Sequence, residues 1–445
     1  MAGINDGATC MIAAESAFGS ILSTDARALD DTTIAGLTAR SVKITIDSFA
    51  NAAGALRQVA YDRSDVTLSG GMSQARVEAA VDGSGPVKRL VGTVSMEGEL
   101  RGFGALSPSA TAFGLLMASG CAATIRTPGT SVTGTYISAN TFSTPSPGND
   151  ATIAAGDIIA VTQADGTYRF CKVTSRVDAG ATNTITTLEP HGIPNAGTAT
   201  VRQCHMWYPA RGGSVGSSVV AQFALADAQQ TLIGVGGRMK SMEIMRTGAS
   251  SLAWRAEVEF PDGEYRSSAV ITAAEPFPMG AASGATTPLV TLVAPMLVTE
   301  DHAGDAAPWS GTAAALPART WSAKIVNDLQ PVADQATRSG RSETAITATN
   351  LEGSFTQTAP TTGADWREVL RLGEKRSVGF TAAGANAAGN GCCVWVGAAE
   401  VAADPGVTFA PTDKTQEVSF RAGDYTGDNG SSGACNLEFV LAFTA

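Results

Sequence analysis

The stretch Val91–Thr124, VGTVSMEGELRGFGALSPSATAFGLLMASGCAAT, carries the clearest structural pattern of the chain. Polar and apolar side chains alternate over residues 93–101, with the period of two that a half-buried strand shows. Ser107 and Pro108 are typical of a helix start, and Gly120 is typical of a helix end. The apolar face of this helix would comprise Ala112, Leu115, Leu116 and Ser119. The stretch therefore predicts a strand followed by a short helix that packs on a sheet.

Composition limits the classes of protein that fit. The 445 residues suggest two to four domains, and no apolar run approaches the length of about 18 residues that a membrane span needs. The first residues carry no basic segment, so we expect no secretory signal. The net charge of −11 argues against binding of duplex DNA through a basic footprint. Seven scattered cysteines suit reduced thiols in a cytosol.

Changes in amino-acid composition and in strand pattern divide the chain into regions. Residues 129–208 are rich in Thr, Ser, Gly, Asn and Pro, and the Asp165-Gly166 pair lies between two predicted strands, as in a hairpin. We expect residues 1–40 to form an N-terminal arm or loose edge segment, 41–128 with 209–275 a first β unit, 129–208 an inserted all-β domain, 276–315 a linker with strand fragments, and 316–445 a second β unit. The fold class is mainly β.

The order strand, Pro-containing turn and short helix occurs twice. GTVSMEGELRGFGALSPSATAFGLLMASG corresponds to AITATNLEGSFTQTAPTTGADWREVLRLG, and MKSMEIMRTGASSLAWRAEVEF corresponds to KTQEVSFRAGDYTGDNGSSGACNLEFVLAF. The second helix would bury Trp366, Val369, Leu370 and Leu372, with Asp365 in its first turn. Since identity between the halves is low, a convergent run of β elements is the alternative to a duplicated domain.

Several of these segments resemble the tail tube proteins of long-tailed bacteriophages. The resemblance lies in the ELRG strand end at Glu99–Gly102, the helix FGLLMASG, and the later GVGGRMKSMEIMRTGASSLAWRAEVEF. The family pattern matches Leu115, Leu116, Ala118 and Gly120 in the helix, and Gly236, Gly237 and Arg238 in a turn that opens a long hairpin. It covers roughly residues 85–128 and 209–445, and its motifs are mostly small and apolar, so that their order carries the weight.

The resemblance implies a fold, a function and partners. Each domain would be a β-sandwich or barrel flanked by a short α-helix, and six domains would form a ring that stacks into a tube around DNA. A duplicated chain would form trimers with pseudo-sixfold symmetry, and the inserted domain would decorate the tube exterior. The implied partners are other copies of the chain, the tape measure protein and packaged DNA in the lumen, and the tail terminator and distal tail proteins at the ends, with no membrane. The protein would assemble in the cytoplasm of the host bacterium and reside in the virion.

Six charged residues are candidates for lumen or ring-contact positions. They are Glu97, Glu99, Arg101, Arg238, Lys240 and Arg246. Glu97 and Glu99 lie on one face of the predicted strand, where an acidic lumen would repel phosphates and let DNA slide. The basic residues could form ion pairs between subunits or rings, and a solvated surface is the alternative.

Catalytic, cofactor and metal chemistry has little support in the sequence. Cys204 and His205 are adjacent, with Cys171 in the same region, but the spacing of zinc ligands is absent; His191 and His302 are the other histidines. Gly234–Gly237 lacks the Lys-Ser/Thr of a phosphate loop, and no G-x-S-x-G elbow occurs. We therefore predict a structural protein without enzymatic activity, cofactor or metal.

Two other classes remain open. A carbohydrate- or host-binding tail fibre or adhesin would need exposed aromatic platforms, whereas aromatic residues make up only 6% of the chain. A secreted enzyme such as a glycoside hydrolase would need a signal and a cluster of carboxylates or histidines. Assembly into tubes, discrete trimers or turnover would distinguish the three.

Overall fold

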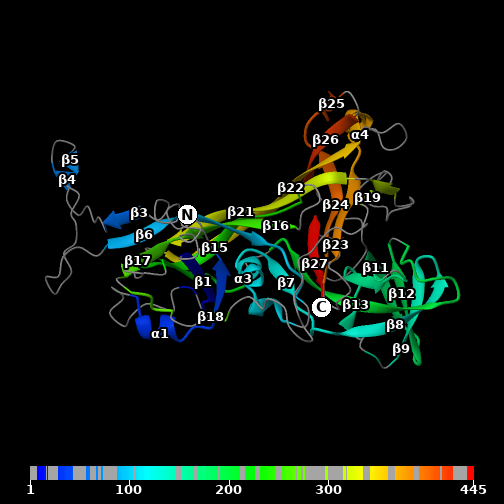
Figure 1. Cartoon of the computed structure of the whole chain (residues 1–445), viewed down its shortest axis with the longest axis horizontal. Coiled ribbons are helices and arrows are strands. Elements are labelled where there is room, and N and C mark those ends of the chain that lie inside the picture. Colours follow the sequence, from blue (N-terminus) through cyan, green and yellow to red (C-terminus); the bar gives the residue numbers. More distant parts are fainter. Residues whose placement is uncertain are drawn as a thin grey trace, which may run out of the picture.

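The computed structural model is mainly β, as the alternating sequence patterns predict, with short helices beside the strands (Figure 1). It describes residues 8–16, 18, 29–43, 57–60, 67–68, 72–73, 88–103, 106–146, 148, 152–164, 166, 168–188, 190–210, 216–225, 231–246, 252–266, 268–271, 274–275, 296–298, 314–316, 318–333, 341–358, 366–383, 390–410, 413–423 and 438–445. Residues 74–80, QARVEAA, also have the pattern of a strand, and they lie outside the described residues.

A first series of antiparallel strands occupies the left and centre of Figure 1. Its pairing order is β2 (Ala39–Lys43), β1 (Ala8–Ala14), β14 (Val219–Leu225), β15 (Thr231–Arg246), β16 (Ala253–Phe260) and β6 (Lys88–Glu99). The start of β6 also pairs with β3 (Arg57–Ala60), and the first half of β15 pairs with β17 (Asp262–Arg266). The segment expected to be a loose arm therefore supplies β1, an inner strand between β2 and β14.

A second series repeats this pairing order. Its strands are β20 (Ala314–Leu316), β19 (Met296–Val298), β23 (Arg376–Ala383), β24 (Gly391–Val401), β26 (Asp413–Ala422) and β22 (Arg341–Thr358), with β21 (Ala318–Ala333) beside β22 and β27 (Phe439–Thr444) beside the first half of β24. The second half of β15 pairs with β21, so the two series share one continuous sheet. Smaller strands complete the described part: β18 (Ala274–Glu275) pairs with β2, β25 (Val407–Ala410) pairs with β26, and β4 (Thr67–Leu68) pairs with β5 (Met72–Ser73).

Six strands between residues 131 and 208 close into a barrel, at the lower right of Figure 1. They are β8 (Ser131–Ser138), β9 (Thr141–Pro145), β10 (Ile158–Thr162), β11 (Tyr168–Asp178), β12 (Thr182–Thr187) and β13 (Thr198–Tyr208), and they pair in the order β8–β9–β12–β11–β10–β13–β8. The antiparallel β10–β11 pair confirms the hairpin expected around Gly166. The end of β13 leaves the barrel and pairs with β27 and with β7 (Ala122–Thr124), which ties the barrel to the sheet.

The helices are short: α1 (Asp31–Ala35), the 3₁₀ turn η2 (Pro108–Ala110), α3 (Ala112–Ala118) and α4 (Trp366–Leu372). The predicted helix cap was wrong, because Ser107 and Pro108 begin η2 and the hydroxyl of Thr111 accepts the N–H of Gly114 at the start of α3. Ser119 is the C-cap of α3, and Gly120 follows where an added Cβ would lie 2.5 Å from the Cε of Met239. Gly120 therefore provides space for close packing.

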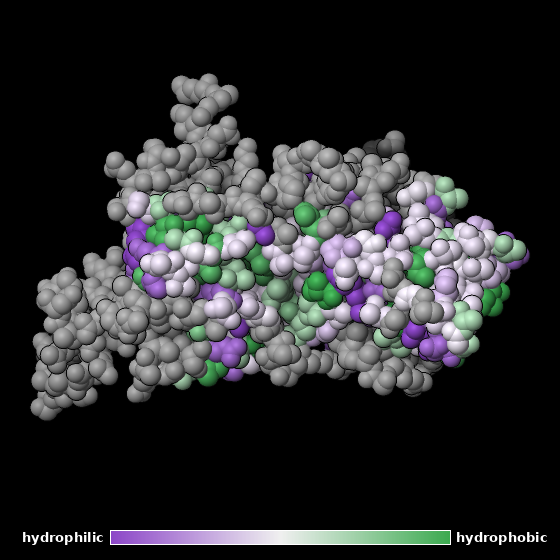
Figure 2. Space-filling view, turned by 90° about the horizontal axis from the view of Figure 1, so that it is seen from below, coloured by the Kyte–Doolittle hydropathy of each residue, from purple (hydrophilic) through white to green (hydrophobic). Residues whose placement is uncertain are grey.

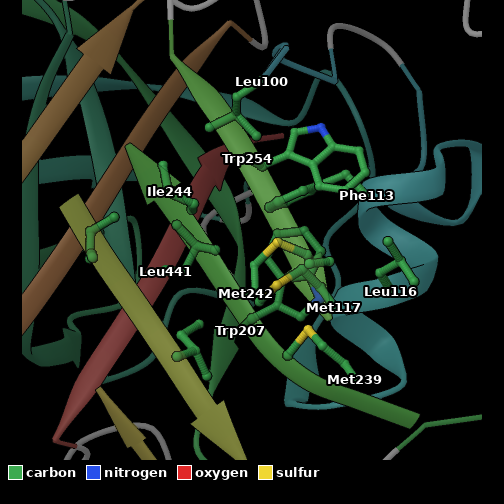
Figure 3. Packing of buried hydrophobic residues seen from close by; sticks show 14 of the residues in the cluster. Leu100, Phe113, Leu116, Met117, Trp207, Met239, Met242, Ile244, Trp254 and Leu441 are labelled. Carbon is green, nitrogen blue, oxygen red and sulfur yellow. The ribbon is translucent and has the colours of Figure 1, made fainter. Parts of the chain in front are cut away.

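The largest hydrophobic core lies between the sheet and the helices. Figure 3 shows Phe113, Leu116 and Met117 of α3 against Met239 and Trp254 of the sheet. The same cluster contains Trp366 and Val369 of α4 with Phe355 and Phe420. One face of the sheet is therefore buried along both series. The opposite face is also buried in two places, where β1, β14 and the first half of β15 form a second cluster and where β24 and β27 meet the barrel.

Strand β15 differs from its prediction. The sequence predicts a turn at Gly236–Gly237, but the chain continues as one 16-residue strand. Gly236 has a φ of +67°, and added Cβ atoms at Gly234 and Gly237 would lie 2.7 and 2.5 Å from the ring of Phe260. These glycines let an irregular strand pass close to an aromatic ring, which explains a glycine cluster without a turn.

Candidate functional site: the polar face of the sheet

The polar face of the continuous sheet carries a row of charged residues that alternate in sign. From β6 to β24, each residue is the cross-strand partner of the next. The row, which we call the charge ladder, comprises Glu97, Arg255, Glu243, Lys324, Glu352, Arg421 and Glu400. Directly opposed residues project to the same side of a sheet with Cβ atoms about 5 Å apart, so each basic side chain has an acidic neighbour on both sides.

Ion pairs join the ladder at its two ends. Arg255 Nη2 lies 3.3 Å from Glu97 Oε2, and Arg421 Nη2 lies 3.0 Å from Glu400 Oε2. Lys375, just before β23, extends the row because its Nζ lies 3.3 Å from Glu400 Oε1. The side chains of Glu97, Arg255 and Arg421 are 67%, 52% and 67% exposed, so the outer rungs face solvent. Exposed ion pairs of this kind contribute little to the free energy of unfolding. Their main effect is therefore on the distribution of charge over this surface.

The same face has further carboxylates whose cross-strand neighbours are uncharged. Glu257 lies between Ser95 and Ser241, and Glu417 lies opposite Thr356. The four acidic and three basic residues of the ladder, together with these acids, make this face net negative. The barrel surface differs, because the outward residues of β8 and β12 are largely Thr and Ser. Figure 2 shows the right of the molecule as mostly pale, near-neutral residues with scattered hydrophilic and hydrophobic patches.

Two of the six residues predicted from the sequence belong to this face and a third lies beside them. Glu97 is a rung of the ladder, and Glu99 lies two residues further along β6, also exposed. Arg101 Nη2 lies 2.7 Å from Glu99 Oε2, so this pair forms within the chain. The structure thus brings Glu97, Glu99 and Arg101 together at one end of the polar face.

The three predicted residues on β15 lie apart from the ladder. Arg238 is buried at 4% exposure and donates to the carbonyl of Gly216 and to Glu343 Oε1, and burial lowers the pKa of its guanidinium. Lys240 is exposed at the irregular step between β15 and β16, and Arg246 is half-buried beside β21. Arg238 therefore connects segments inside the chain.

A buried polar cluster lies where the barrel meets the sheet. Nη2 of Arg126 lies 2.7 Å from Asp157 Oδ2, and the Arg126 N–H donates to His205 Nδ1 at 3.2 Å. Burial lowers the pKa of His205 to about 4, with a further contribution from Arg126, and burial raises the pKa of Asp157. Phe103 packs edge-on against the His205 ring at 5.8 Å. These contacts describe a neutral histidine in an aromatic core, which fits a structural role.

The cysteines and histidines of the described residues form no group of three or more that could hold a metal ion. Cys10, Cys121, Cys171, Cys204, Cys392 and Cys393 are buried free thiols, and burial raises the pKa of Cys121 to about 12. His191 is buried and its Nε2 contacts the carbonyl of Ser138 at 2.7 Å. His302 and Cys435 lie outside the described residues. Among the helices of the described residues, none has the length and apolar character of a membrane span.

The sequence reasoning missed most of the ladder. Arg255, Glu243, Lys324 and Glu352 lie on four strands that meet only through the register of the sheet. A local signal existed in two short matches, Glu-Gly at 97–98 and 352–353, and aromatic-Arg-Ala at 254–256 and 420–422. The order of the predicted elements does not bring these matching segments into alignment.

No protein-family model matches the sequence. No curated protein matches it either.

Proposed function

We propose that this chain is a structural subunit of a bacteriophage tail tube, which polymerises as stacked rings into a hollow conduit for DNA and has no enzymatic activity. The observation that carries the proposal is the repeated strand order, with both copies joined in one sheet that has a single acidic face.

The repeat is supported by strand pairing. Strands β14–β15–β16–β6 pair in the first series as β23–β24–β26–β22 pair in the second, and a helix follows β6 and β22 in each. The flanking strands also correspond, since β17 pairs with the first half of β15 and β27 pairs with the first half of β24. An order this long is unusual for chance convergence of β elements, and we infer a duplicated domain.

The register supports the same inference at single residues. Glu97 opposes Arg255 and Gly98 opposes Trp254, while Glu352 opposes Arg421 and Gly353 opposes Phe420. Both glycines leave room for the aromatic ring across the strand pair. These matches align β26 of the second unit with β16 of the first. The order of the predicted elements instead matches the β26 segment with residues 239–247, nearly all of which belong to the neighbouring strand β15.

The interface between the two units supports a ring. Strand β15 of the first unit pairs with β21 of the second, so different edges meet, which is a head-to-tail contact. Head-to-tail contacts that recur between copies close into rings or continue as helices. Three chains of two units would give a ring of pseudo-sixfold symmetry, and pairing between copies would cover the strand edges that an isolated sheet exposes.

The polar face of the sheet and the position of the barrel suggest which parts of the chain would line the lumen and which would lie outside the tube. We assign the acidic polar face to the lumen, where it would repel the phosphates of DNA. The barrel lies between α3 and β14 in sequence, whereas only residues 373–375 separate α4 from β23. We infer that it is an insertion that decorates the tube exterior, because a domain of this size would block an inward passage. The tape measure protein and DNA would occupy the lumen, with the terminator and distal tail proteins at the ends.

Negative-stain electron microscopy of the purified protein at rising concentration tests the proposal. Stacked rings or hollow tubes are expected, and class averages would count the chains in each ring. Compact monomers at every concentration, including in the presence of a crowding polymer, would contradict it. Glycan binding would then be measured, because a carbohydrate-binding tail protein is the alternative.

A further inference from the structure

The charge ladder places every one of its basic residues between two carboxylates. Arg255 lies between Glu97 and Glu243. Lys324 lies between Glu243 and Glu352, and Arg421 lies between Glu352 and Glu400. The same acid–base–acid arrangement thus occurs three times, with Glu243 and Glu352 each shared by two bases.

This arrangement changes how a polyanion meets the surface. A phosphate at about 4 Å from the central cation would lie roughly 6 Å from both flanking carboxylates, and in one medium the interaction energy scales as charge over distance. Two repulsions at 6 Å exceed one attraction at 4 Å, so the sum is repulsive. The same cation without its neighbours would attract the phosphate.

We infer that the ladder is a device that keeps cations on the polar face while making them unavailable to duplex DNA. Net acidity alone does not give this property, because an acidic surface with isolated arginines would still hold phosphates at those points. The alternation removes such points at Arg255, Lys324 and Arg421 and so makes the ladder non-adhesive from Glu97 to Glu400. This inference rests on the proposed function for its partner and specifies how that partner is kept from binding.

The chain contains matched carboxylates for a test. Glu97 and Glu243 both flank Arg255, whereas Glu257 and Glu417 lie on the same face with only Ser or Thr as cross-strand neighbours. The double variants Glu97→Gln/Glu243→Gln and Glu257→Gln/Glu417→Gln raise the net charge equally. Only the first exposes a basic side chain to phosphate.

The experiment measures binding of a fluorescein-labelled short DNA duplex to the purified full chain by fluorescence anisotropy at low salt. The ladder variant should bind about tenfold more tightly than the control variant, with affinity falling as salt rises. Equal affinities of the two variants, or no binding by the ladder variant, would overturn the inference. Circular dichroism checks that each variant is folded.

A second ladder variant guards against a folding defect. Glu352→Gln/Glu400→Gln exposes Arg421 in the second series and should show the same gain over the control. Since binding is measured on the dispersed chain, the result does not depend on tubes. Tubes without a difference between variants would refute the ladder alone, whereas the difference without tubes would refute the proposed assembly alone.

Discussion

Helices α3 and α4 follow corresponding strands, yet one is buried and the other is half-exposed. Every residue of α3 from Ala112 to Met117 is buried, whereas only Trp366 and Val369 are buried in α4. Leu372, which the sequence places on the apolar face, is 51% exposed, so that part of the prediction was wrong. The same position in two similar units therefore has two environments.

The difference comes from what lies over the helix. Aligned on the glycines that follow them, Gly114 and Ala118 of α3 correspond to Arg367 and Arg371 of α4. A Cβ at Gly114 would lie 2.1 Å from the carbonyl oxygen of Pro108, and one at Gly216 would lie 2.5 Å from that of Ala118. The 3₁₀ turn η2 before α3 and the chain that leaves the barrel both pack against α3, and small residues permit these contacts. Charged residues occupy the uncovered face of α4.

The largest expected effect is a cavity under the covered helix. Leu116→Ala should lower the free energy of unfolding by about 3 kcal/mol, because Leu116 is fully buried and a Leu-to-Ala change leaves a void. Leu372→Ala should change it by less than about 0.5 kcal/mol, since surface substitutions usually do. Urea denaturation followed by tryptophan fluorescence measures both. Similar losses would show that the two helices are equally covered in solution.

The two glycines after the helices show why the sequence predicted only part of this. The expected left-handed glycine cap is absent at Gly120 but present at Gly373, which has a φ of +66°. There the N–H of Glu374 donates to the carbonyl of Val369 at 3.0 Å. Both glycines end a helix in the sequence, but one supplies backbone freedom and the other supplies space. The close packing of Met239 and Asn327 on Gly120 distinguishes it from Gly373.

An effect of intermediate size is expected for alanine substitutions at Gly353 and Gly98, which should lower stability by different amounts. A Cβ at Gly353 would lie 2.3 Å from Phe420 Cζ and 2.7 Å from the carbonyl oxygen of Ser322, while one at Gly98 would lie 3.0 Å from the indole of Trp254. Phe420 is buried and stacks on Phe380 at 5.8 Å, so it has little room to move. Gly353→Ala should therefore cost about 2 kcal/mol of overpacking, and Gly98→Ala about half of that.

The same denaturation experiment ranks these variants. The double change Gly353→Ala/Phe420→Leu should recover part of the lost stability, because a smaller side chain makes room for the added methyl group. A larger cost at Gly98 than at Gly353 would mean that the strand pairs differ from the described register.

The prediction of elements and the prediction of the face depend on different information. Alternation within β6 and β22 suffices to identify strands and the side chains that share one face, such as Glu97 and Glu99. The ladder requires knowing that Lys324 lies between Glu243 and Glu352, residues far from it in sequence or on another strand. Cross-strand register is set by turns, bulges and the buried face, and a pattern within one strand does not contain it.

The smallest expected effect concerns the uncovered face of α4. A hydrogen bond from Arg371 lowers the pKa of Glu368, whereas the aligned residue in α3 is Leu115, which does not titrate. Because the folded pKa lies below the unfolded one, the pair contributes stability at pH values above the unfolded pKa, and this is lost as pH falls through the folded pKa. Glu368→Gln should therefore lose a small amount of stability relative to the wild-type protein at neutral pH, and the two should converge in acid. Thermal midpoints measured from neutral to acidic pH test this, with Arg371→Gln as the partner control. A constant difference across that range would mean that the pair does not form in solution, and α4 would then be as insensitive to pH as α3.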